Sequence, residues 1–158
     1  MKTSVSAVLL VGMLCLASCA GGPRAGRAKA DMPVDGITRL IAHPREVVWS
    51  AIQAYMAERK WPLAETNQEQ GSIRSGEFRL VASHDYAHCS SGRRSAVSEY
   101  EVRISIGLRR VTANGTNVSV DSRLTAISEA GRDSNCKSTG VLEDEMFAGI
   151  DSVVAAWR

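Results

Sequence analysis

The sequence lacks a marked excess of charge of either sign. It has 19 Lys and Arg residues against 17 Asp and Glu residues, which gives a formal net charge of +2 at pH 7. Domains that bind nucleic acids usually carry a strong basic excess on one face. The near balance of charges therefore argues against a nucleic-acid partner.

The chain also lacks a second long apolar segment. Its one run of this kind, "VSAVLLVGMLCL" from Val5 to Leu16, is broken only by Ser6 and Gly12. This run is well short of the roughly 20 apolar residues that a transmembrane helix needs, and it has the length of a signal-peptide core. Because Lys2 supplies a short basic start, we expect residues 1–18 to be a signal peptide.

No set of residues typical of an active site is present in the sequence. The only closely spaced carboxylates that could act as a pair belong to the acidic start of the last predicted helix, at Glu143–Glu145. The segment "SHDYAHC" holds His84, Asp85, His88 and Cys89. His84 and His88 would share a face only in a helix, and no second ligand cluster accompanies them. We expect no metal, no cofactor and no enzymatic activity.

A cysteine with a distinctive context follows the apolar run. Cys19 ends the tetrapeptide "LASC", in which a Leu and two small residues precede the cysteine. This pattern resembles the lipobox of bacterial lipoproteins at every position, whereas Cys15 has a bulky residue where a small one is required. The resemblance implies cleavage before Cys19 and attachment of acyl chains, palmitate among them, to that residue. The alternative is an ordinary secretory signal in which Cys19 is incidental.

The lipobox resemblance predicts where the protein lies. Two or more acyl chains hold a protein stably on a bilayer, whereas one chain gives marginal binding. Ala20 follows the cysteine in place of Asp, which in the enterobacterial sorting rule indicates the periplasmic side of the outer membrane. Residues 19–35 are rich in Gly, Ala and Pro, and we expect a flexible tether with a span of roughly 20–25 Å. Residues 36–158 are expected to form a single domain.

The first half of this domain is expected to contain one helix and several short strands. Pro44 favours a helix start, and apolar residues recur with helical spacing up to about Lys60. The expected apolar face of this helix is Val48, Ile52, Tyr55 and Met56. Expected strands are "ITRLIAH" (Ile37–His43), Leu63–Asn67 and Ser72–Ser75, with Gly71 in the turn between the last two. The segment "EFRLVAS" from Glu77 either continues the last of these strands or forms another.

The second half shows the clearest periodicity in the chain. Apolar side chains alternate strictly with polar ones from Glu99 to Arg109, which predicts a strand with one buried face. Asn114-Gly115 favours a type I′ hairpin turn into a return strand, Thr116 to Ile127. A terminal helix is expected after a cap at Ser138 or Thr139. Its expected apolar stripe is Leu142, Met146, Ile150, Val153 or Val154, and Trp157.

These elements predict an α+β fold. The most economical arrangement is a two-layer sandwich, with an antiparallel sheet of four to six strands and two helices on one face. The run "IAHPREVVWSAIQAYMAERKWPLAETNQEQGSIRS" resembles the small helix-grip-like domains of the C lipoprotein of the bacterial barrel-assembly machinery. It is also similar to the opening of START-like helix-grip domains, in which a longer helix covers a ligand cavity.

Two cysteines remain once the signal is removed and Cys19 is acylated. Cys89 and Cys136 both lie in polar segments that the composition predicts to be loops. Two remaining cysteines in an exported domain favour one disulfide. For a loop of about 50 residues, such a bond stabilises the fold by roughly 4 kcal/mol in the chain-entropy model.

Together these features predict a lipid-anchored protein of the cell envelope whose domain takes part in protein interaction or envelope assembly. The alternative is a START-like carrier of a small hydrophobic ligand. A cavity of a few hundred Å³ between helices and sheet would favour the carrier. A filled core with an exposed apolar patch would favour the interaction module.

Overall fold

The computed structural model describes residues 36–82, 86–89, 97–128 and 131–157, without the side chains of 131–135. Its helices are α1 (Arg45–Glu58) and α2 (Val141–Ala156). Its strands are β1 (Ile37–Ile41), β2 (Leu63–Asn67), β3 (Ser72–Ser75), β4 (Phe78–Val81), β5 (Ala87–Cys89), β6 (Val97–Thr112), β7 (Gly115–Ser128) and β8 (Gly131–Ser138). The expected α+β class is therefore confirmed, and the segment after Glu77 forms a strand of its own.

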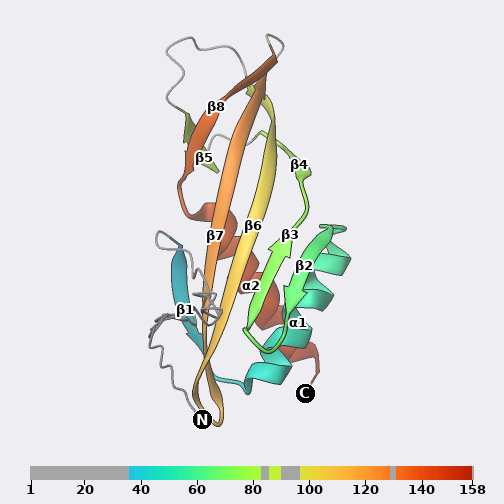
Figure 1. Cartoon of the computed structure of the whole chain (residues 1–158), viewed down its shortest axis with the longest axis vertical. Coiled ribbons are helices and arrows are strands. Elements are labelled where there is room, and N and C mark those ends of the chain that lie inside the picture. Colours follow the sequence, from blue (N-terminus) through green and yellow to red (C-terminus); the bar gives the residue numbers. More distant parts are fainter. Residues whose placement is uncertain (1–35, 83–85, 90–96, 129–130, 158) are drawn as a thin grey trace, which may run out of the picture.

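All of these strands belong to one antiparallel sheet, which follows the order β2-β3-β6-β7-β8-β5 (Figure 1). The long strands β6 and β7 form its centre, while β4 pairs with β6 and β1 pairs with β7 outside this order. The sheet has eight strands in the described residues, so the expectation of four to six was too low. The additional strands are β5 and β8, in segments that were expected to be loops.

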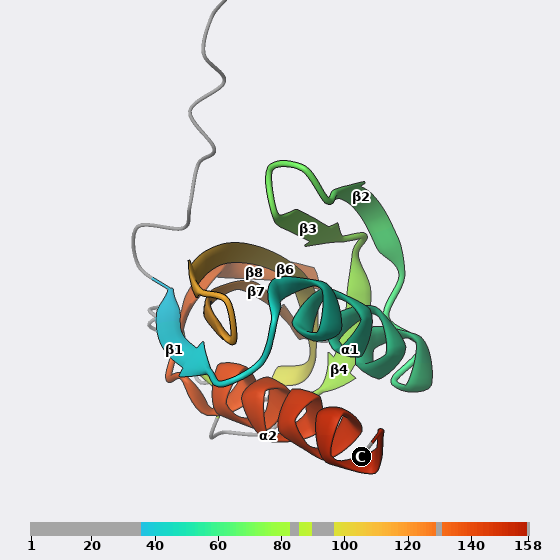
Figure 2. The same ribbon diagram turned by 90° about the horizontal axis from the view of Figure 1, so that it is seen from below.

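Both helices cover the same side of the curved sheet (Figure 2), as expected. The alternating apolar residues of β6 face this side and are buried, and so is the expected face of α1. The largest fully buried side chains include Phe147, Ile52, Met56, Ile73 and Ile104. Phe147 was not part of the expected stripe of α2, whereas Trp157 was expected there but follows the helix and is 52% exposed. We call the helix-covered side of the sheet the inner face and the opposite side the outer face.

Two local expectations about turns and caps were wrong. Positive φ angles occur in the described residues at Lys60, Gly71 and Gly140, so Asn114-Gly115 does not form a type I′ turn. The cap position of α2 is held by Gly140 with a φ of 94°, and no side chain caps it.

The strands that flank β6 and β7 are interrupted at the same level of the sheet. On one side, β3 pairs with Ser105–Gly107 of β6, and β4 pairs with Glu99–Val102 of the same strand. On the other side, β1 pairs with Thr116–Val120 of β7, and β8 pairs with β7 between Leu124 and Ser128. The residues of β6 and β7 at these two interruptions are partners of each other, because Arg103 is opposite Arg123. The sheet is therefore only two strands wide at this level.

Candidate functional site

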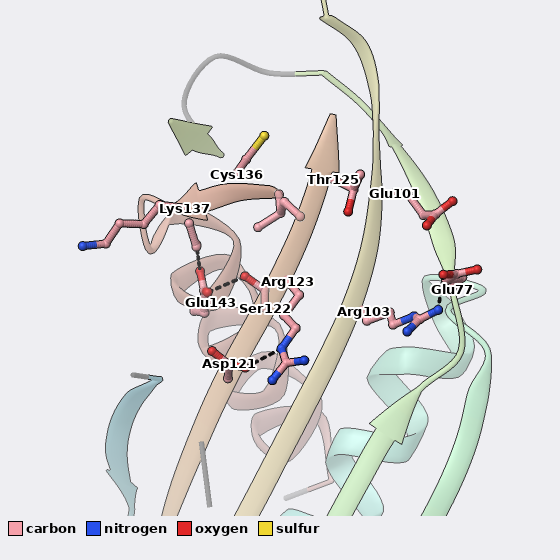
Figure 3. A pocket seen from close by; sticks show the side chains of 12 residues that line it. Glu77, Glu101, Arg103, Asp121, Ser122, Arg123, Thr125, Cys136, Lys137 and Glu143 are labelled. Carbon is pink, nitrogen blue, oxygen red and sulfur yellow. Dashed lines mark hydrogen bonds and ion pairs between the residues drawn. The ribbon is translucent and has the colours of Figure 1, made fainter. Parts of the chain in front are cut away.

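A hollow of about 830 Å³ lies at the level where the flanking strands are interrupted (Figure 3). Part of its lining comes from the outer face, at Glu77, Glu101, Arg103, Asp121, Arg123, Thr125 and Lys137. The rest comes from the inner face, at Ser122, Leu124, Cys136, Ser138 and Glu143. The hollow thus reaches from the outer face past the edge of β7 to the start of α2, and most of its lining is charged or polar.

Two arginines occupy the centre of the outer-face part. Arg103 on β6 is directly opposite Arg123 on β7. Arg103 forms an ion pair with Glu77, which lies in the interruption between β3 and β4. Arg123 Nε lies 4.0 Å from Asp121 Oδ2, and the Arg123 side chain is 86% exposed. Among the described side chains, each guanidinium has one carboxylate partner, and Figure 3 shows each directed toward that partner.

A buried carboxylate forms the inner wall of the hollow. Glu143 is only 4% exposed and lies in the first turn of α2, where the helix dipole stabilises negative charge. Its carboxylate accepts a hydrogen bond from the Ser122 hydroxyl of β7 and another, 2.8 Å long, from Ser138 Oγ. Ser138 Oγ also accepts a hydrogen bond from Gly140 N at 3.1 Å. The serine expected to cap α2 therefore holds the first turn through Glu143.

At the interruption between β3 and β4, a serine side chain forms a hydrogen bond with the backbone of β6. Ser75 is buried, and its Oγ accepts a 2.8 Å hydrogen bond from the Ile104 backbone N–H. A side chain thus replaces the ladder partner that β6 lacks at this point, which keeps the backbone donor satisfied. Glu77 follows two residues later and reaches Arg103 across the outer face.

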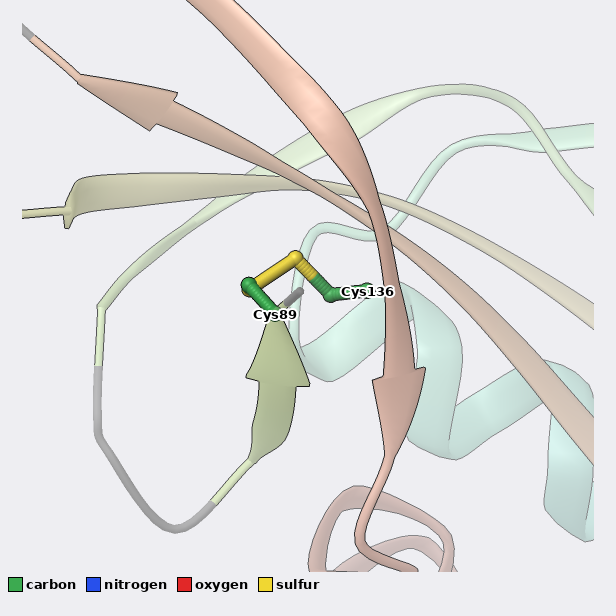
Figure 4. Close-up of a disulfide and its surroundings, with 2 residues drawn as sticks. All are labelled: Cys89 and Cys136. Carbon is green, nitrogen blue, oxygen red and sulfur yellow. A yellow bond between two sulfur atoms is a disulfide. The ribbon is translucent and has the colours of Figure 1, made fainter. Parts of the chain in front are cut away.

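The expected disulfide joins Cys89 and Cys136, which confirms that pairing (Figure 4). The two residues are direct partners in the antiparallel β5·β8 pair, and both pack against the inner core. Both cysteines lie in strands, so the expectation that they belong to loops was wrong. The bond ties the edge strand β5 to β8, which leads directly into α2.

A second polar cluster connects α1, α2 and Tyr86 beside β5. The Tyr86 hydroxyl donates to Glu145, with distances of 3.2 and 3.1 Å to its two carboxylate oxygens. Burial, together with this hydrogen bond, raises the pKa of Tyr86 above its ordinary value. Arg59 lies over the rings of Tyr55 and Trp61 and 3.9 Å from Glu145. The cluster links the two helices at the edge of the core.

The other residues considered from the sequence are not brought into a site. Cys19 and the tether lie outside the described residues, as do His84 and Asp85. His88 is exposed on β5, away from the inner side that carries Cys89. No group of three potential metal ligands occurs within the described ranges. Neither of the two helices described is long and apolar enough to cross a membrane.

Comparison with known proteins finds structural similarity and no sequence match. No family model matches the chain, and no curated protein matches it. Among solved structures, the fold is similar to that of a DUF4468 family protein from Bacteroides ovatus, with a TM-score of 0.37 and 10% sequence identity over 77% of this chain and 80% of that chain. A similarity at this level supports no functional argument.

Proposed function

We propose that this protein is a lipid-anchored component of the bacterial cell envelope, on the periplasmic side of the outer membrane, and that its domain is a non-enzymatic interaction module. The observation that carries the cellular location is the disulfide between β5 and β8. Disulfides persist in oxidising compartments such as the periplasm and are rare in the cytosol. This supports the export that the lipobox at Cys19 predicts.

The packing favours an interaction module over a carrier of hydrophobic ligands. The layer between the helices and the sheet is occupied by large apolar side chains such as Phe147, Ile52 and Met56. The hollow lies elsewhere, and its lining is mainly charged and polar. An apolar ligand needs an apolar cavity, so neither region fits the START-like alternative.

The β2 edge is the surface that we propose for docking. All but the last residue of β2 are exposed, and β2 pairs with β3 on one side only in the described sheet. An edge strand offers unpaired backbone groups to an added strand of a partner. Leu63, which is 42% exposed, adds an apolar contact at this edge.

Two measurements test the proposal. Intact mass of the protein purified from membranes should show acyl chains on a chain that begins at Cys19, and thiols at Cys89 and Cys136 that react with an alkylating agent only after reduction. A photo-crosslinker at Leu63 should then give an adduct with one envelope protein, identified by its mass, whereas one at the exposed Asp151 of α2 should not. An unlipidated chain would overturn the anchor, and adducts from Asp151 alone would move docking to the helix face.

A further inference from the structure

Four parts of the chain meet at one end of the sheet, at the bottom of Figure 1, which we call the turn end. They are the end of β1, the start of α1, the turn between β2 and β3, and the turn between β6 and β7. Thr116 of β7 pairs with Ile41 of β1, and its hydroxyl donates a 2.9 Å hydrogen bond to the backbone oxygen of His43. The backbone oxygen of Gly71 accepts a 2.7 Å hydrogen bond from Leu108 N, which holds the β2–β3 turn against β6. These contacts make the turn end one connected surface.

The outermost part of the turn end is exposed and carries no charge. Residues 111–114, "VTAN", are exposed along their whole length. Val111 is 51% exposed, and Leu40 of β1 is 63% exposed. A Cβ atom placed on Gly115 would lie 3.6 Å from Leu40 Cδ1, so the Leu40 side chain lies beside the β6–β7 turn. We call Leu40 and residues 111–114 the tip, which brings two exposed apolar side chains to the same end of the domain.

One arginine beside the tip has a charge that no carboxylate balances. Arg109 of β6 is exposed, precedes the tip directly on the strand, and has no ion-pair partner among the described side chains. The other two arginines of the turn end are engaged. Arg110 forms an ion pair with Glu46, and Arg45 donates a 3.1 Å hydrogen bond to the backbone oxygen of Glu69. The positive charge that is available to a ligand therefore lies at Arg109.

The position of β1 determines which end of the domain can approach a bilayer. Ile37 pairs with Val120 in the middle of β7, and β1 runs from there to the turn end at Ile41. At about 3.4 Å for each residue, the turn end lies roughly 17 Å from the start of β1. The opposite end of β7, at Ser128, lies roughly 27 Å from Val120. The expected span of residues 19–35, roughly 20–25 Å, therefore suffices for the turn end to touch the bilayer but not for the opposite end.

From these observations we infer that the turn end is a contact surface for a bilayer that carries anionic phospholipids. The tip enters the head-group layer, where Leu40 and Val111 leave water, and Arg109 donates charge-assisted hydrogen bonds to lipid phosphates. The inference rests on the proposed lipid anchor. Two apolar side chains and one arginine would bind a free domain weakly, but the anchor keeps the tip at a high effective concentration beside the bilayer.

Photo-crosslinking of the mature lipoprotein in vesicles of phosphatidylcholine and phosphatidylglycerol tests the contact. A benzophenone side chain at Ala113 of the tip should form phospholipid adducts, identified by intact mass, in about fivefold or greater yield than one at Val81. Val81 is the matched control, because it is 80% exposed on β4, which pairs with the part of β6 away from the turn end. Flotation of the same vesicles reports the anchor separately. Protein that floats but gives equal yields at both positions would overturn the contact alone, whereas protein that does not float would overturn the anchor and the contact together.

Variants with the crosslinker at Ala113 test the assigned roles. Arg109→Gln should lower the adduct yield by about threefold in vesicles with phosphatidylglycerol and leave it unchanged in phosphatidylcholine alone, because the lost attraction is to anionic lipid. Leu40→Asn should lower the yield in both kinds of vesicle, since it removes an apolar contact. The matched control is Arg79→Gln, because Arg79 is an exposed arginine of β4 that is paired with Glu99. An equal loss in this control, or unchanged yields in both tip variants, would contradict the inference.

Discussion

The two faces of the sheet are built from the same strands and have opposite physical character. On β6, the residues Tyr100, Val102 and Ile104 point to the inner face and are at most 2% exposed. Their neighbours Glu101 and Arg103 point to the outer face and line the hollow. Burial of one large apolar side chain stabilises a fold by about 1.5–3 kcal/mol, whereas an exposed ion pair contributes about 0–1 kcal/mol. Stability therefore resides on the inner face, and the outer face is available for recognition.

At the level of the two strand interruptions, the inner face also carries polar residues. Ser122 is an inner-face residue of β7, yet it is polar and donates to Glu143 of α2. The interruption between β1 and β8 brings this buried carboxylate to the hollow without placing it on the surface.

The largest effect is expected for Phe147→Ala on the inner layer. Phe147 is 1% exposed in the middle of α2, and its truncation leaves a cavity that should lower the free energy of unfolding by about 4 kcal/mol. Urea unfolding followed by tryptophan fluorescence measures this change. Val81→Ala is the matched control, because Val81 is apolar but 80% exposed on β4, and its change should stay below about 0.5 kcal/mol. Similar losses in both variants would contradict the assignment of stability to the inner face.

A smaller loss is expected when the disulfide is removed. The variant with both Cys89→Ala and Cys136→Ala should lose about 3 kcal/mol of unfolding free energy, since its unfolded chain is no longer restricted by a closed loop. The reduced wild-type protein should show a comparable loss, and a reducing agent should leave the double variant unchanged. If reduction does not change the unfolding free energy of the wild type, the bond does not stabilise the domain.

Much of the inner face could be predicted from the sequence, because periodicity reports directly on burial. The alternation along β6 and the helical spacing from Val48 to Met56 each indicate which side chains face the core. The bounds of β2 and β3 agree with expectation because Pro62 and Gly71 mark the segment ends, whereas β1 ends at Ile41, two residues before the end of the expected strand at His43.

The candidate site was largely missed, since long-range pairing creates it. The residues of β8, "GRDSNCKS", have low strand propensity, and they form a strand because β7 and β5 pair with them. The alignment of the two interruptions depends on the registers of β3, β4, β1 and β8, which no local pattern specifies. The polar face of β6 was recognisable, and it is the one signal that pointed to the lining at Glu101 and Arg103.

The helix layer offers a test in which the usual effect of a substitution is reversed. Gly→Ala inside a helix normally stabilises it by about 1 kcal/mol. At Gly149 of α2, however, an added Cβ would lie 2.0 Å from Tyr55 Cε2 of α1. We expect Gly149→Ala to lower the unfolding free energy by about 1–3 kcal/mol, because the two helices must separate or the ring must move. Thermal unfolding of Gly149→Ala in a Tyr55→Leu background provides the control, where the change should be neutral or stabilising.

The smallest effect is expected for an outer-face ion pair whose two residues are not part of the lining described for the hollow. Arg79 Nη1 lies 3.2 Å from Glu99 Oε2, and the two side chains are 66% and 39% exposed. A double-mutant cycle with Arg79→Gln and Glu99→Gln should give a coupling of about 0.5 kcal/mol that decreases as salt is added, because solvent and ions screen exposed charges. A coupling of several kcal/mol that salt does not change would show that the outer face also stabilises the fold. The charges that line the hollow would then have to be assigned a structural role before a role in recognition.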